Sequence, residues 1–275
     1  MNQTQIPGQT MRRARPKPRL AEVVSVEQLT PHMVRVVLTG EELAGFESKG
    51  PAEHLKVFLP APGDDHIRLP EWGPEGPVLA EGQPRPLNRT YTPRRWGAER
   101  RELAVDFLLH GEGPGSTWAQ QARAGQVVAT SGQPGGAYRI DPEATSFLIA
   151  GDEAALPGVA TILETLPAGA TARVFVEVAD PSEELALDSP ARVDITWLHH
   201  GRVTGQVGRS LERAITEASV AADTRVWVGC EAAVMRDIRR SLIERGIDKA
   251  HMLTQGYWKY GATNHPDNDK GHDVE

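Results

Sequence analysis

The sequence predicts a two-domain protein, in which an antiparallel β-barrel is followed by an α/β domain built on a parallel sheet. The chain has 275 residues, which suits two domains of ordinary size. From Leu20 to about Ile140, short β-branched and apolar runs are separated by Gly and Pro. After Asp141, apolar runs alternate with segments of helical periodicity. Short strands at regular spacing are typical of small barrels, whereas strands that alternate with helices form parallel sheets.

The first half contains the predicted strands of the barrel. Two β-branched runs flank a turn at Thr30 and Pro31, between residues 20 and 40. Four further apolar runs follow, at residues 54–60, 89–96, 102–110 and 126–132. The stretch from Ala61 to Arg85 is rich in Gly and Pro, which predicts a long loop or a hairpin.

The second half alternates predicted strands with predicted helices. The strands are expected at residues 146–151, 171–180, 193–200 and 225–230. The helices are expected at residues 156–166, 207–220 and 231–246. The change of pattern places the domain boundary near residues 140–145, so we expect one domain over 19–140 and the other over 141–261.

The two ends of the chain lack periodicity. Residues 1–18 are polar and basic and contain three prolines, which predicts a disordered basic arm. Residues 262–275 are polar throughout, which predicts a disordered tail.

Composition narrows the class of protein. A net charge of −7 argues against nucleic acid as a partner, because phosphate binding needs a basic surface. The only cysteine is Cys230, so an iron–sulfur cluster, an internal disulfide and a zinc knuckle are excluded. No apolar run approaches the roughly 20 residues of a membrane span, so we expect no integral membrane segment. The sequence indicates a cytoplasmic protein, and we expect a monomer.

A charged and aromatic motif lies at Arg89-Thr90-Tyr91-Thr92. Alternation along a strand places Arg89 and Tyr91 on one face and Thr92 on the other. A guanidinium binds phosphate through two parallel hydrogen bonds, and an aromatic ring offers a flat surface to a cofactor. The alternative is an ordinary edge strand with an exposed arginine.

A glycine-rich turn follows the strand that ends at His110. Ser116 or Thr117 is predicted to cap a helix that begins near Trp118. Free N–H groups at the start of such a helix can bind a phosphate. The alternative is a capped turn without a ligand, with His110 as an ordinary residue at the end of a strand.

Two further motifs lie in the second half. Residues 151–158 join the first predicted strand of the parallel sheet to its first helix, at the edge where doubly wound folds bind nucleotides. The usual GxGxxG pattern of dinucleotide-binding folds is absent there. Residues 256–261 contain three aromatics within four positions, and these either cover a flat ring or dock the end of the chain onto the core.

Together with the run His54–Pro60, these segments follow one another as they do in the siderophore-interacting protein family of ferric-siderophore reductases. That family belongs to the ferredoxin–NADP reductase superfamily, and the chain resembles it over about residues 19–261. Two departures stand out. Ala154 occupies a position where the family often has Thr, and the turn at residues 132–136 lacks an arginine that the family often carries, although Arg139 lies nearby.

The resemblance implies an FAD-binding barrel and an NAD(P)H-binding α/β domain. It assigns FAD contacts to these residues: Arg89, Tyr91, Thr92, Asp106, Leu108, His110, Gly115, Ser116, Thr117, Tyr257 and Trp258. It assigns the nicotinamide nucleotide site to Gly151, Asp152 and Glu153. It places Lys56 and Lys259 beside the ferric siderophore, and Arg139 is the nearby candidate for the missing arginine. No residue is assigned as catalytic acid, base or nucleophile, and none as a metal ligand.

The resemblance implies an FAD-dependent ferric-siderophore reductase, which passes electrons from NADH or NADPH through FAD to chelated Fe(III) during iron acquisition. NADH is slightly favoured, because Asp180, Glu183 and Glu184 follow the second predicted strand of the parallel sheet and would repel a 2′-phosphate. Two alternatives are a flavin reductase that feeds electrons to a protein partner and a non-enzymatic siderophore-binding module.

Overall fold

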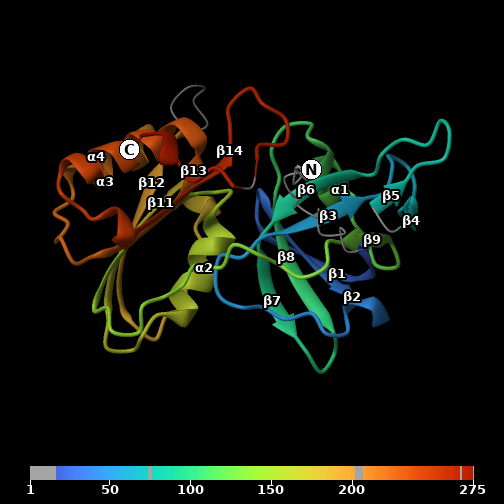
Figure 1. Cartoon of the computed structure of the whole chain (residues 1–275), viewed down its shortest axis with the longest axis horizontal. Coiled ribbons are helices and arrows are strands. Elements are labelled where there is room, and N and C mark those ends of the chain that lie inside the picture. The colour runs from blue at the N-terminus through green and yellow to red at the C-terminus, as the bar shows by residue number, and fades with distance from the viewer. Residues whose placement is uncertain (1–16, 74–75, 202–206, 267, 275) are drawn as a thin grey trace, which may run out of the picture.

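A computed structural model describes residues 17–73, 76–201, 207–266 and 268–274 (Figure 1). The predicted basic arm lies outside the described residues except for its last two positions. The chain forms an antiparallel sheet followed by a parallel sheet with helices, as the sequence predicts.

The first sheet has seven antiparallel strands in the order β6-β3-β9-β1-β2-β8-β7. It curves so that β6 also contacts β8, although the two strands are not neighbours in the sheet. Alternate residues point inward, among them Val36 and Leu38 of β2 and Val105 and Phe107 of β8, all of them fully buried. The strands are β1 (Arg19–Thr30), β2 (Met33–Thr39), β3 (Leu55–Leu59), β6 (Leu87–Tyr91), β7 (Pro93–Gly97), β8 (Glu102–Leu108) and β9 (Val127–Thr130).

Short elements connect these strands. The predicted loop or hairpin between Ala61 and Arg85 contains a two-stranded hairpin. The short elements of this half are η1 (Glu41–Leu43), β4 (Glu71–Gly73), β5 (Gly76–Val78) and the helix α1 (Pro114–Gln120).

The second sheet has five parallel strands in the order β12-β11-β10-β13-β14. Four of them were predicted, whereas β14 was expected only as an aromatic end of the chain. The strands are β10 (Ser146–Asp152), β11 (Thr171–Val178), β12 (Arg192–His199), β13 (Arg225–Glu231) and β14 (Met252–Trp258). The helices of this half are α2 (Leu156–Thr165), α3 (Arg209–Glu217) and α4 (Ala232–Glu244), with short turns η2 (Pro181–Glu183), η3 (Lys249–His251) and η4 (His272–Val274).

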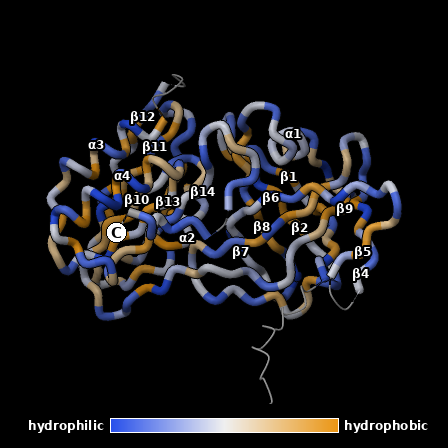
Figure 2. Tube along the Cα trace, turned by 45° about the horizontal axis from the view of Figure 1, so that its top comes forward, coloured by the Kyte–Doolittle hydropathy of each residue, from blue (hydrophilic) through white to orange (hydrophobic). Residues whose placement is uncertain are grey.

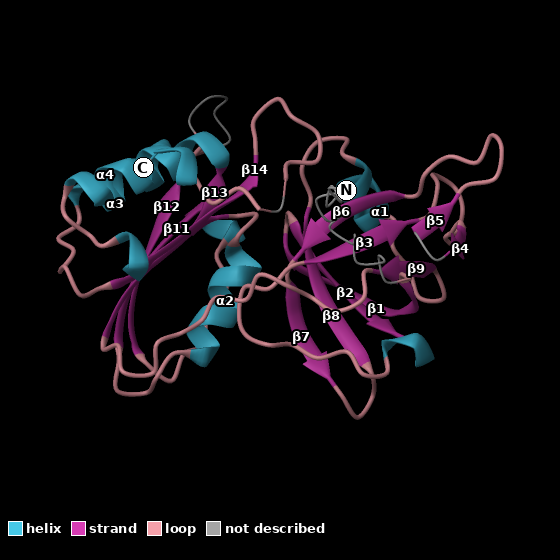
Figure 3. Cartoon of the chain, in the orientation of Figure 1, coloured by secondary structure: helices cyan, strands magenta, loops and turns pink. Residues whose placement is uncertain are grey.

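Helices cover both faces of this sheet (Figure 3). Phe147 and Ile149 of β10 belong to the cluster that includes α2, whereas Leu148 and Ala150 belong to the cluster that includes α3 and α4. A parallel strand that is buried on both faces is apolar throughout, which explains the unbroken apolar run of β10. Figure 2 shows the same distribution, with hydrophobic segments along the strands of both sheets.

The two domains share a packed interface. The apolar cluster around α2 takes in Met33, Ala52 and Tyr138 from the first half of the chain. Arg94 of β7 forms a two-pronged ion pair with Glu164 of α2, at 2.6 and 3.0 Å. This packing places the carboxyl ends of the parallel strands beside the barrel.

The segment predicted as a disordered tail instead packs on the second domain. The backbone N–H of Gly256 donates to the carbonyl oxygen of Asp269 at 2.8 Å. Arg236 of α4 pairs with both Asp269 and Asp273. Periodicity did not reveal this packing, because the pairs of Arg236 with Asp269 and Asp273 join residues more than thirty positions apart.

Within the described residues, no helix is both long and apolar enough to cross a membrane.

Candidate functional site

A cavity of about 460 Å³ lies between the barrel and the carboxyl ends of the parallel strands. Its walls come from β6, β8 and α1 on one side and from β10, β14 and the residues after β14 on the other. Most of the residues predicted to bind a cofactor line it: Arg89, Tyr91, Thr92, Asp106, Leu108, His110, Gly115, Ser116, Asp152, Glu153, Tyr257 and Trp258. The structure therefore brings motifs from both halves of the chain to one site.

Tyr91 and Gly115 form a close contact on the barrel side. The Tyr91 ring packs on Phe107 with centroids 4.2 Å apart. A Cβ at position 115 would lie 2.1 Å from the Tyr91 hydroxyl oxygen, so only glycine fits there. Burial raises the pKa of Tyr91, so its hydroxyl stays neutral. Gly115 thus serves to seat the Tyr91 side chain.

The helix after the glycine-rich turn begins earlier than predicted. It starts at Pro114, with Gly113 at the N-cap and no side-chain cap, so Ser116 and Thr117 lie inside the helix. Proline at the first helical position has a suitable φ and lacks an N–H that needs a partner. The Ser116 hydroxyl instead accepts a 3.0 Å hydrogen bond from the backbone N–H of His110. Thr117 is exposed and is not among the described residues that line the cavity.

His110 lies at the edge of the cavity. Burial lowers its pKa, and Arg89 nearby acts in the same direction, although Glu153 opposes both. A lowered pKa favours the neutral imidazole at neutral pH. His110 is therefore a neutral hydrogen-bonding group in this wall of the cavity.

Thr92 and Tyr257 connect the two domains across the site. Thr92 is buried, and its side chain lies near enough to the Tyr257 hydroxyl to act against the rise that burial causes in the pKa of Tyr257. The Tyr257 ring meets Trp227 edge-on, with centroids 6.1 Å apart. A Cβ at Gly229 would lie 2.8 Å from the Tyr257 ring, so this glycine makes room for the tyrosine. Tyr257 thus has a fixed position at the domain interface.

Asp106 is held in an ion pair. Arg35 donates to both of its carboxylate oxygens, at 2.7 and 2.8 Å, and Asp106 is 5% exposed. A carboxylate bound in this two-pronged way has little capacity left for a ligand. Asp106 therefore shapes the cavity wall rather than presenting a free charge to it.

Asp152 accepts four hydrogen bonds at the end of β10. Its donors are the backbone N–H groups of Ala154 and Ala155, the backbone N–H of Glu231 at 2.9 Å, and the Trp258 indole Nε1 at 2.7 Å. Burial raises the pKa of Asp152 to about 7. Asp152 thus joins the ends of β10, β13 and β14.

Carboxylates occupy the starts of all three helices along this edge. Asp152 accepts from the residues just before α2, Glu177 from residues at the start of α3, and Glu231 from the first turn of α4. Helix starts bind anions through free N–H groups, but these N–H groups already have partners. The phosphates of a nucleotide would therefore need other donors at this site.

Of the residues predicted to form the nicotinamide nucleotide site, Gly151 and Glu153 differ in their relation to the cavity. Gly151 is buried, and a Cβ there would lie 3.1 Å from the carbonyl oxygen of Gly229, so it allows the two strands and α2 to pack closely. It is not among the described residues that line the cavity. Glu153 does line it, while one of its oxygens accepts from the backbone N–H of Ala179 at 2.6 Å.

Of the three residues predicted to meet the siderophore, one lines the cavity. Lys259 lines the cavity and is exposed. Lys56 lies on β3 opposite Thr90, and Arg139 is exposed in the segment before β10. Neither Lys56 nor Arg139 is among the described residues that line the cavity.

Several lining residues were missed by the sequence analysis. His54 comes directly before β3 and is the first residue of the run His54–Pro60, so the sequence motif could have identified it. Met33 and His200 lie in runs that predicted only strands, and Gln255 lies directly before the aromatic motif at residues 256–261. Residues 262–265 also line the cavity, and their polar sequence gave no signal.

The carboxylates behind the predicted NADH preference have other partners. Asp180 caps η2 through the backbone N–H of Ser182. Glu183 is buried and binds the turn between β1 and β2, and Glu184 pairs with His199 at 2.9 Å. The geometry therefore adds no support to a preference based on these acids.

The donor set of the cavity suits FAD. Tyr91 and Trp258 offer aromatic surfaces to a flat ring, and Arg89 offers a guanidinium to a pyrophosphate. Leu108 adds an apolar surface to the cavity, and the neutral imidazole of His110 adds a hydrogen-bonding group.

Two family models match the chain, one after the other. Residues 22–138 match the family model of the siderophore-interacting FAD-binding domain, and residues 144–261 match that of the siderophore-interacting protein.

Relatives match along nearly the whole chain. The ferric vibriobactin reductase of Vibrio cholerae is 32% identical, covering 94% of this chain and 95% of its own. The NADPH-dependent ferric-chelate reductase of Escherichia coli is 31% identical, covering 86% and 91%. The crystal structure of a siderophore utilization protein from T. fusca superposes with a TM-score of 0.81 at 37% identity, covering 91% and 96%. The chain belongs to the siderophore-interacting protein family.

Proposed function

We propose that the protein is an FAD-dependent ferric-siderophore reductase that takes its electrons from a nicotinamide nucleotide. The observation that carries this proposal is the cavity itself. It joins the Arg89–Thr92 motif of the barrel to the carboxyl ends of the parallel strands, where doubly wound folds bind nucleotides. The names of the relatives support the same reaction.

The residues of the chain bind and orient the reactants. Arg89 binds the pyrophosphate of FAD, and Tyr91 and Trp258 lie against its ring system. Bound FAD supplies the chemistry that protein side chains lack, since it accepts a hydride from the nicotinamide and passes electrons singly to Fe(III). Thr92 lies near Tyr257 at the domain interface, and we assign its hydroxyl to the flavin.

Lys259 attracts and orients the ferric siderophore. The chain carries a net charge of −7, so an anionic chelate needs a local positive group at the mouth of the cavity. Lys259 provides one on the β14 side. Lys56 and Arg139 are not among the described residues that line the cavity, and we assign them to the approach of the chelate rather than to its bound state.

The donor is a nicotinamide nucleotide, and a preference for NADH over NADPH stays a prediction. Its test is steady-state kinetics with both donors, and a clear advantage for NADPH would contradict it.

We place the reaction in the cytoplasm, where nicotinamide nucleotides are kept reduced. We also propose that a monomer suffices, because both walls of the cavity come from one chain.

The test begins with the cofactor. We expect purified protein to be yellow and to release FAD, identified by mass spectrometry, when it is heat-denatured. Release of FMN alone would contradict the assignment, and absence of any flavin would favour a non-enzymatic siderophore-binding module. The holoprotein with NADH or NADPH should form Fe(II) from a ferric siderophore. Electron transfer only to a partner protein would favour the flavin reductase.

A further inference from the structure

The residues after β14 form a strap over the cavity. We use the term C-terminal strap for residues 262–266 and 268–274. In Figure 1 this segment leaves the end of β14, arches toward the barrel and returns to α4. Its first four residues, Ala262 to His265, line the cavity that the FAD motifs of the barrel also line. The strap is therefore part of the site's wall.

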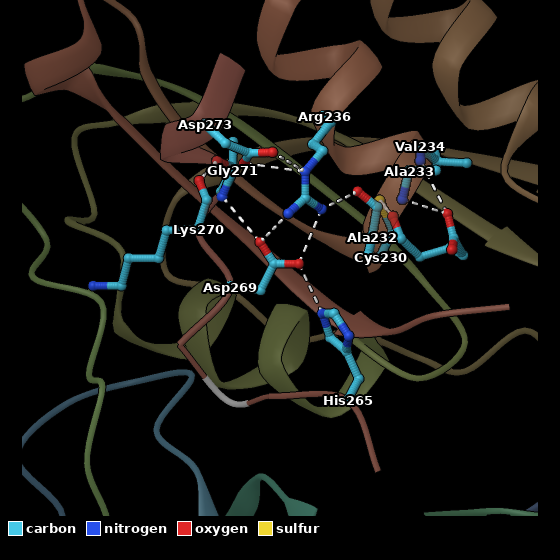
Figure 4. Close-up of polar contacts among 12 residues, drawn as sticks. Cys230, Ala232, Ala233, Val234, Arg236, His265, Asp269, Lys270, Gly271 and Asp273 are labelled. Atoms are coloured by element: carbon cyan, nitrogen blue, oxygen red, sulfur yellow. Dashed lines mark hydrogen bonds and ion pairs between the residues drawn. The ribbon is translucent and has the colours of Figure 1, made fainter. Parts of the chain in front are cut away.

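Arg236 of α4 anchors the far part of the strap (Figure 4). Its guanidinium donates to both oxygens of Asp269, at 2.8 and 2.9 Å, and to Asp273 at 3.0 Å. It also donates to the carbonyl oxygen of Ala232 at 2.9 Å, which fixes the side chain on its own helix. Asp269 is largely buried, with 11% of its side chain exposed, so this ion pair is shielded from solvent. Its several bonds form one clamp.

The clamp reaches the cavity through His265. The His265 ring nitrogen Nε2 lies 2.8 Å from an oxygen of Asp269, the same carboxylate that Arg236 holds. The strap backbone is also tied to β14, where the Thr254 hydroxyl donates to the carbonyl oxygen of Lys270 at 2.8 Å. The wall residue His265 is thus connected to Arg236 by direct contacts.

Two glycines make this docking sterically feasible. A Cβ at Gly256 would lie 2.9 Å from Nε2 of His265 and 3.0 Å from a carboxylate oxygen of Asp269. Gly271 has a φ of +65°, and a Cβ there would lie 2.8 Å from the sulfur of Met235. The close approach disfavours a side chain at Gly256, and the positive φ disfavours one at Gly271. The sequence is therefore adapted to a docked strap.

We propose that the C-terminal strap is a wall of the FAD-binding site and that Arg236 sets how tightly FAD is held. This inference rests on the proposed function, since it takes FAD as the occupant of the cavity. Arg236 is not among the described residues that line the cavity, so it acts as a positioning residue through Asp269 and His265. A strap released from the clamp uncovers one side of the cavity, and bound FAD then dissociates faster.

The first experiment compares Arg236→Met with Arg240→Met in the full-length holoprotein. Arg240 is the control, because it lies one turn along the same helix, pairs with surface residue Asp237, and forms no ion pair with the strap among the described contacts, since its charge acts on Asp273 only at longer range. The dissociation constant of FAD is measured from the fluorescence of released flavin. Hydrogen exchange reports the protection of the strap. We expect Arg236→Met to raise the FAD dissociation constant by about fivefold and to speed exchange in residues 262–274. Arg240→Met should match the wild type.

A second pair of variants displaces the strap without altering a charge. Gly271→Ala places a methyl group against Met235, outside the cavity. Gly246→Ala is its control, because Gly246 also has a positive φ, +84°, but has open space around its Cβ position. We expect Gly271→Ala to weaken FAD binding as Arg236→Met does, and Gly246→Ala to leave it unchanged.

The outcomes separate the inference from the proposed function. If wild-type protein binds FAD and both strap variants show faster exchange with unchanged FAD affinity, the strap is not a wall of the site. If exchange in the strap stays at the wild-type rate in both variants, Arg236 and Gly271 do not hold it, and the inference fails. If wild-type protein binds no FAD at all, the proposed function fails and takes the inference with it.

Discussion

The carboxylate of Asp152, at the end of β10, accepts a 2.7 Å hydrogen bond from the indole Nε1 of Trp258, at the end of β14. The two strands are separated in the sheet by β13, whose Glu231 donates its backbone N–H to the same carboxylate oxygen. One buried side chain therefore determines where Trp258 lies in the cavity. An aromatic residue in this position can cover a flat cofactor only if it is held in place.

Replacing Asp152 by Asn should destabilise the protein, because the amide nitrogen cannot accept the bonds from Glu231 and Trp258. We expect the free energy of unfolding to fall by about 1–3 kcal/mol at pH 5. Burial raises the pKa of Asp152 from 3.8 to about 7. Between these two pH values, Asp152 therefore keeps its proton in the folded state but has released it in the unfolded state. The stability linked to Asp152 is complete below pH 3.8 and is lost as the pH rises through about 7.

The difference between wild type and Asp152→Asn should therefore shrink from pH 5 to pH 8. Urea unfolding of both proteins at several pH values measures it. A difference that is constant across this range would show that Asp152 does not titrate there.

Replacing Arg89 by Ala should weaken FAD binding by about tenfold to a hundredfold, because a charge-assisted bond to a phosphate is lost. Arg95 is the control, since it lies on β7, the next strand along the chain, and is exposed. Fluorescence titration of the apoprotein with FAD measures both variants. Equal affinity in the Arg89→Ala and Arg95→Ala proteins would remove Arg89 from the cofactor site.

Replacing Lys259 by Ala should slow reduction of an anionic ferric siderophore and leave flavin reduction by the nicotinamide donor nearly unchanged. The loss should be smaller for Lys56→Ala and Arg139→Ala, since these residues are not among the described residues that line the cavity. It should also shrink as salt is added, because screening acts over about 10 Å at 0.1 M ionic strength. Stopped-flow measurement of the two half-reactions separates these effects, and an equal loss in both half-reactions would contradict the assignment.

Replacing Glu183 by Gln should weaken the contact between the domains. The buried carboxylate accepts a 2.6 Å bond from the Thr30 hydroxyl and also binds the ring of His32 at 2.5 Å. Burial acts to raise the pKa of Glu183, but the bonds from Thr30 and His32 outweigh it, so the pKa is lowered overall. The stabilisation is therefore present above the ordinary glutamate value and is lost as the pH falls through the lowered pKa.

We expect Glu183→Gln to cost about 1–3 kcal/mol in the free energy of unfolding at pH 7. The cost should decrease in acid, where wild-type Glu183 is itself protonated. Denaturant unfolding at pH 7 and pH 4 tests both statements, and an unchanged midpoint at pH 7 would contradict them.

The regular helices and strands were predictable because the apolar residues that each of them buries recur at a regular spacing along the sequence. The apolar run at residues 146–151 corresponds to β10, and the helical spacing at 156–166 corresponds to α2. The start of α1 was missed because Ser116 and Thr117 are common caps, whereas the helix begins at Pro114.

Site residues that lie together in one sequence motif could be predicted. The surroundings of other site residues depend on contacts with distant parts of the chain and could not be predicted. Arg89, Tyr91 and Trp258 line the cavity as expected. The partners of Asp106 and Glu183 come from other strands, so the sequence could not show that their carboxylates are already bound. The C-terminal strap has no periodic pattern in its sequence, so the sequence could not show that an ion pair to α4 holds it in place.

The most direct test of the central claim is anaerobic reoxidation of the FAD-loaded protein. The protein is reduced with one equivalent of NADH or NADPH and then mixed with a ferric siderophore in a stopped-flow spectrometer, with a chromogenic Fe(II) chelator present. We expect the flavin absorbance to return as two equivalents of Fe(II) appear, because each hydride carries two electrons and each Fe(III) accepts one. Flavin that stays reduced in the presence of the ferric siderophore, with no Fe(II) formed, would contradict the proposed function.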